Sequence, residues 1–158
     1  MTKIYPAEFS GCKSLGFGNV DFNNLKSVGA YAFQGCFSDC DNLESVDLSG
    51  LTTISGYGAL NSAFQGDDRL TSFDISNLTT LSGTQAFTYA FSGCYSLQSI
   101  EFPKLSSFTG TNCFMYAFRE CSNLKAVKFP DSIKEISDDA FCYCNAVNFR
   151  VSSNNPAY

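Results

Sequence analysis

Apolar residues recur along this chain at a regular interval of about 27 residues. Large apolar side chains keep this interval in several registers, among them Phe37, Phe64, Phe91 and Phe118, and Leu43, Leu70, Leu97 and Leu124. A fixed period of about 20 to 50 residues is typical of repeat architectures, in which each unit buries its apolar edge only against its neighbours. The pattern therefore predicts a stack of similar coils.

The spacing of apolar residues changes within each unit. In the segment 86–91, two Ala-Phe pairs stand four residues apart, which fits one face of a short helix. Further on, apolar and polar residues alternate, as in 46–48 and 127–129, which predicts short strands. Each predicted helix is expected to end in a left-handed residue two positions after its last phenylalanine, at Gly11, Gly66 and Gly93.

These elements predict one α/β solenoid domain over residues 1–158, with about five coils of ~27 residues. A parallel strand ladder is expected on one face and short helices on the other. The coils are expected at about 9–36, 37–63, 64–90, 91–117 and 118–140, with a partial coil at 141–158. The last full coil is shorter by about one helical turn, because Phe141 follows Phe118 sooner than the repeat requires.

The motif Phe-x-x-Cys-x-x-Leu-x-x-Ile-x-Phe-Pro runs from Phe91 to Pro103, and recurs with one conservative change from Phe118 to Pro130. This motif resembles the BspA-like class of leucine-rich repeats. The resemblance implies a right-handed leucine-rich-repeat solenoid. It also implies a bacterial or protozoan surface protein that binds host matrix proteins or other cells, and hence an extracellular or cell-surface location. The residues after Met1 show no secretion signal.

Charge narrows the classes of partner. Charged residues make up only 16% of the chain, and the net charge is −5. Residues 1–79 contain four basic and nine acidic side chains, which disfavours nucleic acid and favours a basic partner. No apolar stretch approaches the ~18 residues of a membrane span.

The predicted strands place one column of acidic residues on their outer face. The outward residue of successive strands is acidic at Asp21, Asp47, Asp74 and Glu101, and becomes basic at Lys128. At a strand spacing of ~4.8 Å, neighbouring carboxylates repel by about 1–3 kcal/mol. Such a column is explained either by a basic protein partner or calcium, or by a solvated acidic edge whose side chains splay apart.

Two tyrosines form a second candidate surface. Tyr89 and Tyr116 lie one repeat apart, each between the two phenylalanines of its unit. Tyrosine is common on binding surfaces because it offers a large area with few rotamers. A partly exposed aromatic at the edge of a coil is equally consistent with a surface that binds nothing.

Cysteine chemistry is not expected to make this chain an enzyme. Most of the eight cysteines occupy core positions of the repeat, where a reduced thiol behaves as a small apolar side chain. The alternative is at least one disulfide bridge, and Cys142 is the cysteine that falls outside the regular positions of the repeat. The chain has no histidine to activate a thiolate or to complete a zinc site. We therefore predict no catalytic residue, no metal site and no cofactor.

The function predicted from these observations is non-enzymatic binding or adhesion to a protein or cell-surface partner through the strand face. A repeat surface offers an extended contact area without an enclosed pocket. The alternative is a structural spacer, or an oligomerising repeat fragment of a larger surface or virion protein.

Overall fold

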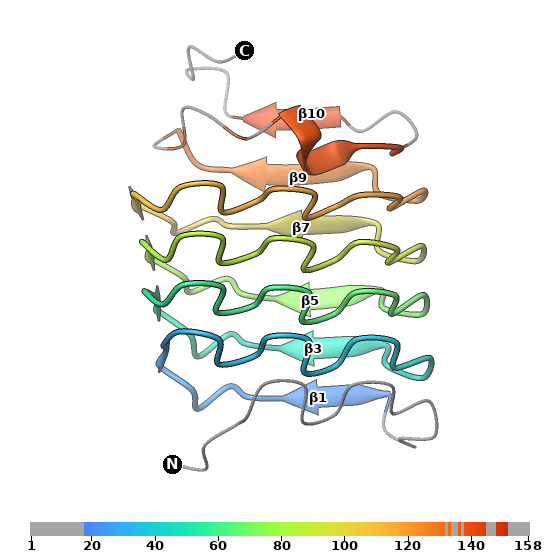
Figure 1. The fold of residues 1–158 in the computed structure, drawn as a ribbon, viewed down its shortest axis with the longest axis horizontal. Coiled ribbons are helices and arrows are strands. Elements are labelled where there is room, and N and C mark those ends of the chain that lie inside the picture. The colour runs from blue at the N-terminus through green and yellow to red at the C-terminus, as the bar shows by residue number, and fades with distance from the viewer. Residues whose placement is uncertain (1–17, 132, 134–135, 137, 145–147, 152–158) are drawn as a thin grey trace.

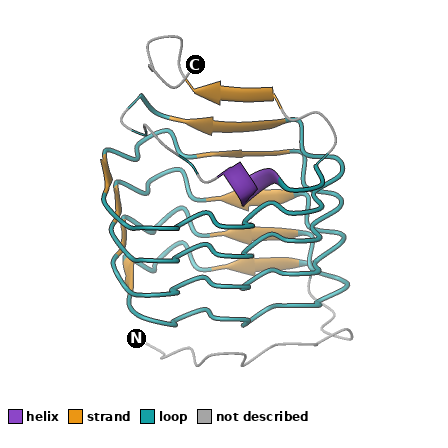
Figure 2. Cartoon of the chain, turned by 45° about the horizontal axis from the view of Figure 1, so that its top comes forward, coloured by secondary structure: helices purple, strands orange, loops and turns teal. Residues whose placement is uncertain are grey.

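The computed structural model describes residues 18–131, 133, 136, 138–144 and 148–151, which form a β-solenoid with two ladders of parallel strands (Figures 1 and 2). The longer ladder contains two hydrogen-bonded sheets in sequence: β1 (Asn19–Asp21), β3 (Ser45–Asp47) and β5 (Ser72–Asp74), then β7 (Ser99–Glu101), β9 (Ala126–Phe129) and β10 (Asn148–Val151). The shorter ladder contains β2 (Ser27–Val28), β4 (Thr53–Ile54), β6 (Thr80–Leu81) and β8 (Ser107–Phe108). The predicted parallel strand ladder is therefore confirmed.

The register of the ladders follows the sequence repeat. Asn19 pairs with Ser45 and Ser45 with Ser72, so each step between these strands is close to one repeat of the sequence. The step from Ser99 to Ala126 is again one repeat, whereas the step from Ala126 to Asn148 is shorter. The described chain thus forms about four turns, each one repeat long, and a shorter step into β10, where the sequence predicts about five coils.

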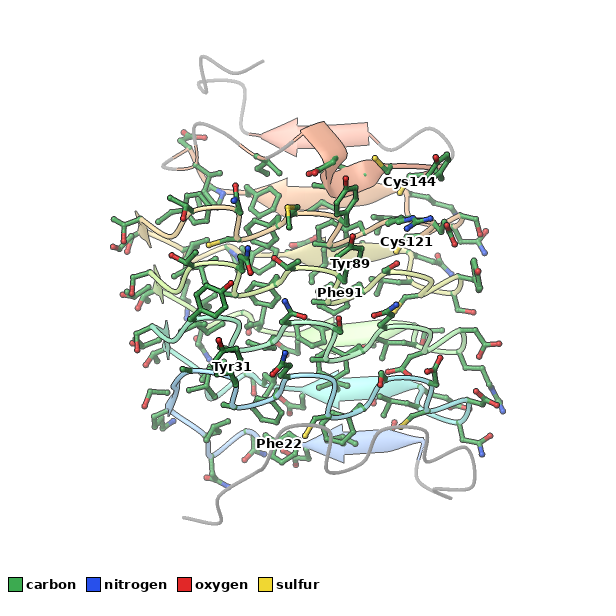
Figure 3. All side chains as sticks on the ribbon, in the orientation of Figure 1. Phe22, Tyr31, Tyr89, Phe91, Cys121 and Cys144 are labelled. Atoms are coloured by element: carbon green, nitrogen blue, oxygen red, sulfur yellow. The ribbon has the colours of Figure 1, made fainter. Side chains whose placement is uncertain are left out.

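A ladder of phenylalanine rings fills the interior, as the repeat predicts. The rings of consecutive coils stack with centroids 5.2–5.8 Å apart and interplanar angles of 3–14°, in the order Phe37, Phe64, Phe91, Phe118 and Phe141. Phe91, labelled in Figure 3, is fully buried and also meets Phe73 edge to face at 4.7 Å. Offset and edge-to-face ring pairs contribute beyond the area that they bury.

The predicted short helices are wrong. The segments that carry the Ala-Phe pairs are successive turns, and in the described residues the only helical element is a 3-10 turn, η1 (Asp138–Phe141). Every fourth residue of these segments has a left-handed backbone, for example Tyr31, Gly35 and Asp39 with φ of 55°, 57° and 57°. An α-helix has φ near −63° at every position, so this backbone cannot be helical. Gly66 and Gly93 are left-handed as predicted, with φ of 80° and 77°, although no helix ends there, and Gly11 lies outside the described residues.

Hydrogen bonds between coils replace those of a helix. The backbone N–H groups of alternate residues donate to the next coil, as from Phe33 to the Ala59 carbonyl (2.7 Å) and from Phe37 to the Ala63 carbonyl (2.9 Å). The turn segments of successive coils, drawn in front of the strands in Figure 1, therefore form a third hydrogen-bonded side. A helix is about 10–12 Å wide, so helices beside strands spaced ~4.8 Å apart would force the stack to curve, whereas these turn segments bond directly from coil to coil.

Candidate functional site

The strand face carries the acidic column where the sequence places it. Asp21 is paired in register with Asp47, and Asp47 with Asp74, while Glu101 is paired with Lys128. All of these side chains are exposed except Asp47, which is half-buried. The ladder thus brings Asp21, Asp47 and Asp74 into one row, and Glu101 lies on the first strand of the second sheet.

Three of the four acidic side chains make a local turn at the end of their strand. The Oδ1 atoms of Asp21, Asp47 and Asp74 each accept a hydrogen bond from the backbone N–H two residues later, at 2.8, 2.8 and 2.9 Å. This is the Asx turn, in which a short carboxylate or amide side chain closes the turn in place of a backbone carbonyl. The aspartates therefore have a structural role in addition to their place on the acidic strand face.

The residue two positions later explains which strands carry aspartate. Asn23, Ser49 and Ser76 have the N–H that the turn requires. After Glu101 and Lys128 the corresponding residues are Pro103 and Pro130, which have no N–H to donate. The column changes away from aspartate at the same two coils, so the sequence contained the signal for this role.

The Asx turn at Asp74 predicts a difference between two substitutions. Asp74→Ala removes the acceptor for the Ser76 N–H and is expected to lower the free energy of unfolding by about 1 kcal/mol. Asp74→Asn keeps an Oδ1 acceptor and is expected to lower the free energy of unfolding by less than half as much as Asp74→Ala. Urea denaturation of both variants measures the difference. Glu101→Ala is the control, because Pro103 offers no N–H for a turn; equal losses for both Asp74 variants would contradict the turn.

The basic residues near the column form surface ion pairs. Lys128 bonds to Glu101, and Arg69 bonds to Glu44 at 3.0 Å. Exposed pairs of this kind stabilise a fold by about 0–1 kcal/mol. Within the described part of the chain, no group of three or more Cys, Asp or Glu side chains is placed to hold a metal ion, so the column offers no support for calcium.

Tyr89, labelled in Figure 3, lies on a turn segment on the side of the solenoid opposite the longer ladder, and Tyr116 lies next to it one repeat later. The rings of Tyr89 and Tyr116 stack 5.0 Å apart with an interplanar angle of 19°, and both are half-buried. The nearby Asp139 raises the pKa of the Tyr116 phenol. Arg119 lies 5.5 Å from the ring centre of the exposed Tyr143. The tyrosines and the acidic column therefore belong to separate surfaces.

An open groove of about 420 Å³ runs along the corner between the two ladders. Its lining is polar and includes Lys26, Thr52, Asn77 and Lys104. The Lys104 ammonium donates to Asn77 Oδ1 (2.6 Å), and the Thr52 hydroxyl donates to the Lys26 carbonyl (3.0 Å). These bonds connect successive coils, so the groups that line the groove also serve the fold. The sequence did not single out this corner.

The thiols occupy the interior. Cys94, Cys113 and Cys121 are buried free thiols, and Cys142 and Cys144 are half-buried free thiols. Burial raises the pKa of the Cys113 thiol to about 11 and that of Cys121 still further. A thiol with a raised pKa is a poor nucleophile at neutral pH, which agrees with a structural role. Cys142, the cysteine outside the regular positions of the repeat, is a free thiol and forms no disulfide.

Asp67 replaces the cysteine of the repeat in one coil. This carboxyl group is fully buried, and burial raises its pKa to about 8. The signal was present in the sequence, because an acid stands at a position where the neighbouring coils carry Cys40 and Cys94.

Comparison with known proteins identifies the family. A family model described as the BspA type leucine rich repeat region matches residues 1–116 and 88–157, in six copies. A leucine rich cell surface protein from Faecalibacterium prausnitzii, whose crystal structure is known, aligns with a TM-score of 0.60 and 24% sequence identity over 88% of this chain. The chain spans about a third (34%) of that protein.

A search of curated proteins found no match. No helix in the described residues is long and apolar enough to cross a membrane. The repeat motif, the solenoid and the family match over nearly the whole sequence agree, and the chain belongs to the BspA-type leucine-rich repeat family.

Proposed function

We propose that this chain is a non-enzymatic recognition module that binds a basic protein partner at the cell surface through its longer strand ladder. The family is associated with cell surfaces and its repeat modules generally bind proteins, which supports the proposal. The observation that carries it is the in-register row of the outward carboxylates of Asp21, Asp47 and Asp74, followed by the exposed Glu101 on the next strand of the ladder. The strands hold these side chains at a fixed spacing, so little conformational entropy is lost when a partner binds.

The Asx turns leave the carboxylates able to bind. A carboxylate has about four lone-pair sites, and the turn at Asp47 or Asp74 uses one of them through Oδ1. A lysine or arginine of the partner can approach the remaining sites from solvent. The turn also restricts the rotation of each side chain, which aligns the row for a partner with regularly spaced basic groups.

The experiment separates charge from turn structure. In the triple variant Asp47→Asn, Asp74→Asn, Glu101→Gln, three charges are lost while the Oδ1 acceptors of both turns remain. Binding of the whole chain to a panel of immobilised extracellular-matrix proteins is measured by surface plasmon resonance at about 50 and 150 mM salt. We expect the wild-type chain to bind at least one of them, and the triple variant to bind at least about tenfold more weakly with an unchanged melting temperature.

A matched control removes the same number of charges elsewhere. The control variant carries three substitutions outside the strand column: Asp68→Asn, Glu120→Gln and Asp131→Asn. We expect its affinity to stay within about twofold of the wild type. Equal binding by the wild type and the strand-face variant would exclude the acidic row as the binding surface. Absence of binding to every matrix protein would instead favour the spacer function.

A further inference from the structure

One position of the repeat normally places a thiol against the preceding coil. The Sγ–H groups of Cys94, Cys121 and Cys144 donate to the carbonyls of Phe64, Phe91 and Phe118, at 3.1, 3.0 and 2.8 Å. For Cys94 and Cys121 the acceptor lies 30 residues earlier in the chain. Each of these residues thus supplies a hydrogen-bond donor between two coils. Asp67 stands at this position in its own coil.

The surroundings of Asp67 offer little to stabilise a negative charge. The side chain is fully buried, and its Oδ1 accepts one hydrogen bond, from the Cys40 N–H at 2.8 Å. Its Oδ2 is buried without a hydrogen-bond partner. The charged groups that act on it are acidic, namely Asp39, Asp41 and Asp68, and the Cys94 thiol faces it from the next coil. None of the ion pairs found in the described residues includes Asp67.

We propose that Asp67 is a neutral carboxylic acid in the folded chain, and that loss of its proton opens the contact between the coils before β3 and β5. A protonated carboxyl has one O–H donor and one carbonyl acceptor. The acceptor receives the Cys40 N–H, and the O–H replaces the thiol donor of the other coils. By repeat equivalence its acceptor is the Phe37 carbonyl, which precedes Asp67 by the same sequence separation as Phe64 precedes Cys94. A buried carboxylate without a cationic partner would instead lose its hydration with little to offset that loss, which disfavours the charged form.

The proposal makes folding depend on pH with a definite sign. Burial raises the pKa of Asp67 from 3.8 to about 8, so the folded chain keeps this proton over a range in which the unfolded chain has lost it. Stability from this group is therefore fully present below pH 3.8 and is lost as the pH rises towards about 8. Within that window one proton is taken up on folding, so the folding equilibrium constant falls about tenfold per pH unit. Above it this group contributes no further dependence.

Two measurements test the protonation state. The first follows the side-chain carboxyl ¹³C shift of Asp67 by NMR in the wild-type chain, where we expect a midpoint several pH units above that of an exposed aspartate. The second compares urea denaturation of the wild type and Asp67→Asn between pH 5 and 7.5 with thiols kept reduced. The asparagine keeps an acceptor for the Cys40 N–H but has no proton to lose. We expect the ratio of the two folding constants to change about tenfold per pH unit.

Asp68→Asn serves as the control, because Asp68 is the adjacent acid and is exposed. It is expected to leave the wild-type pH dependence in place, whereas Asp67→Cys, which restores the repeat residue, is expected to remove it. Parallel pH profiles of the wild type and Asp67→Asn would overturn the proposal. A ¹³C midpoint near pH 4 would also overturn it, and this measurement holds even if the variants fail to fold.

Discussion

Replacement of Phe91 by alanine is expected to lower the free energy of unfolding by about 3–5 kcal/mol, a large fraction of the roughly 5–15 kcal/mol that stabilises a typical domain. The Phe91 ring is fully buried and contacts four other rings: it stacks on Phe64 and Phe118 at 5.8 and 5.5 Å, and also packs against Phe73 and Phe87. Its removal leaves a cavity that the surrounding rings cannot close without breaking their own stacking. Urea denaturation followed by far-UV circular dichroism measures the loss.

The position of Phe91 in the stack makes the loss cooperative. In a solenoid each coil is stabilised mainly by its two neighbours, so a defect in a middle coil weakens both halves. Phe108→Ala is the matched control, because Phe108 is only half-buried and, among the described residues, contacts one ring, that of Phe114, at 6.0 Å. We expect Phe108→Ala to lower the free energy of unfolding by less than half as much as Phe91→Ala. Similar losses for both variants would show that the phenylalanine ladder is not the main source of stability.

Gly83→Ala is expected to destabilise the chain by an amount at the upper end of the roughly 1–3 kcal/mol typical of overpacked cores. A Cβ atom at position 83 would stand 2.2 Å from the carbonyl oxygen of Gly56 in the preceding coil. This obstacle is backbone, so no side-chain rotation relieves the clash, and the two coils must move apart. Thermal and urea denaturation of the variant measure the effect.

Gly29 provides the control for this prediction within the same column of the repeat. It stands one repeat before Gly56, and a Cβ atom at this position would meet no atom of the described residues within 4 Å. Gly29→Ala is expected to leave stability unchanged, or to raise it by about 0.5 kcal/mol through the lower entropy of the unfolded chain. A loss as large as that of Gly83→Ala would mean that the glycines are retained for reasons other than the close approach of the coils.

The sequence alone determined the repeat, the core columns and the strand register. The regular spacing of Phe37, Phe64 and Phe91 reappears as a stack of rings, and Asp21, Asp47 and Asp74 lie in one row as predicted. These features were predictable because, in a solenoid, residues separated by one repeat of the sequence become neighbours in adjacent coils. Residues one repeat apart must lie side by side, whatever the local backbone does between them.

The backbone between the strands was decided only by the tertiary structure. Apolar pairs four residues apart fit one face of an α-helix, and they fit equally well a series of turns with a left-handed residue at every fourth position, such as Tyr31, Gly35 and Asp39. The left-handed positions hold Gly58 and Gly66 in the next coil, which was a signal for turns. The turns are stabilised by hydrogen bonds from one coil to the next, such as that from the Phe33 N–H to the Ala59 carbonyl, and these bonds exist only in the stack.

The roles of the acidic residues also required the structure. Acidic side chains have three different roles. Asp47 and Asp74 each close a turn, Glu101 pairs with a lysine, and Asp67 is fully buried. Periodicity predicts which side of the coil a residue faces. It does not predict which backbone N–H or neighbouring charge lies within hydrogen-bond distance. That depends on how one coil is placed against the next, because the partners of these side chains are fixed by local turn geometry and by contacts between coils.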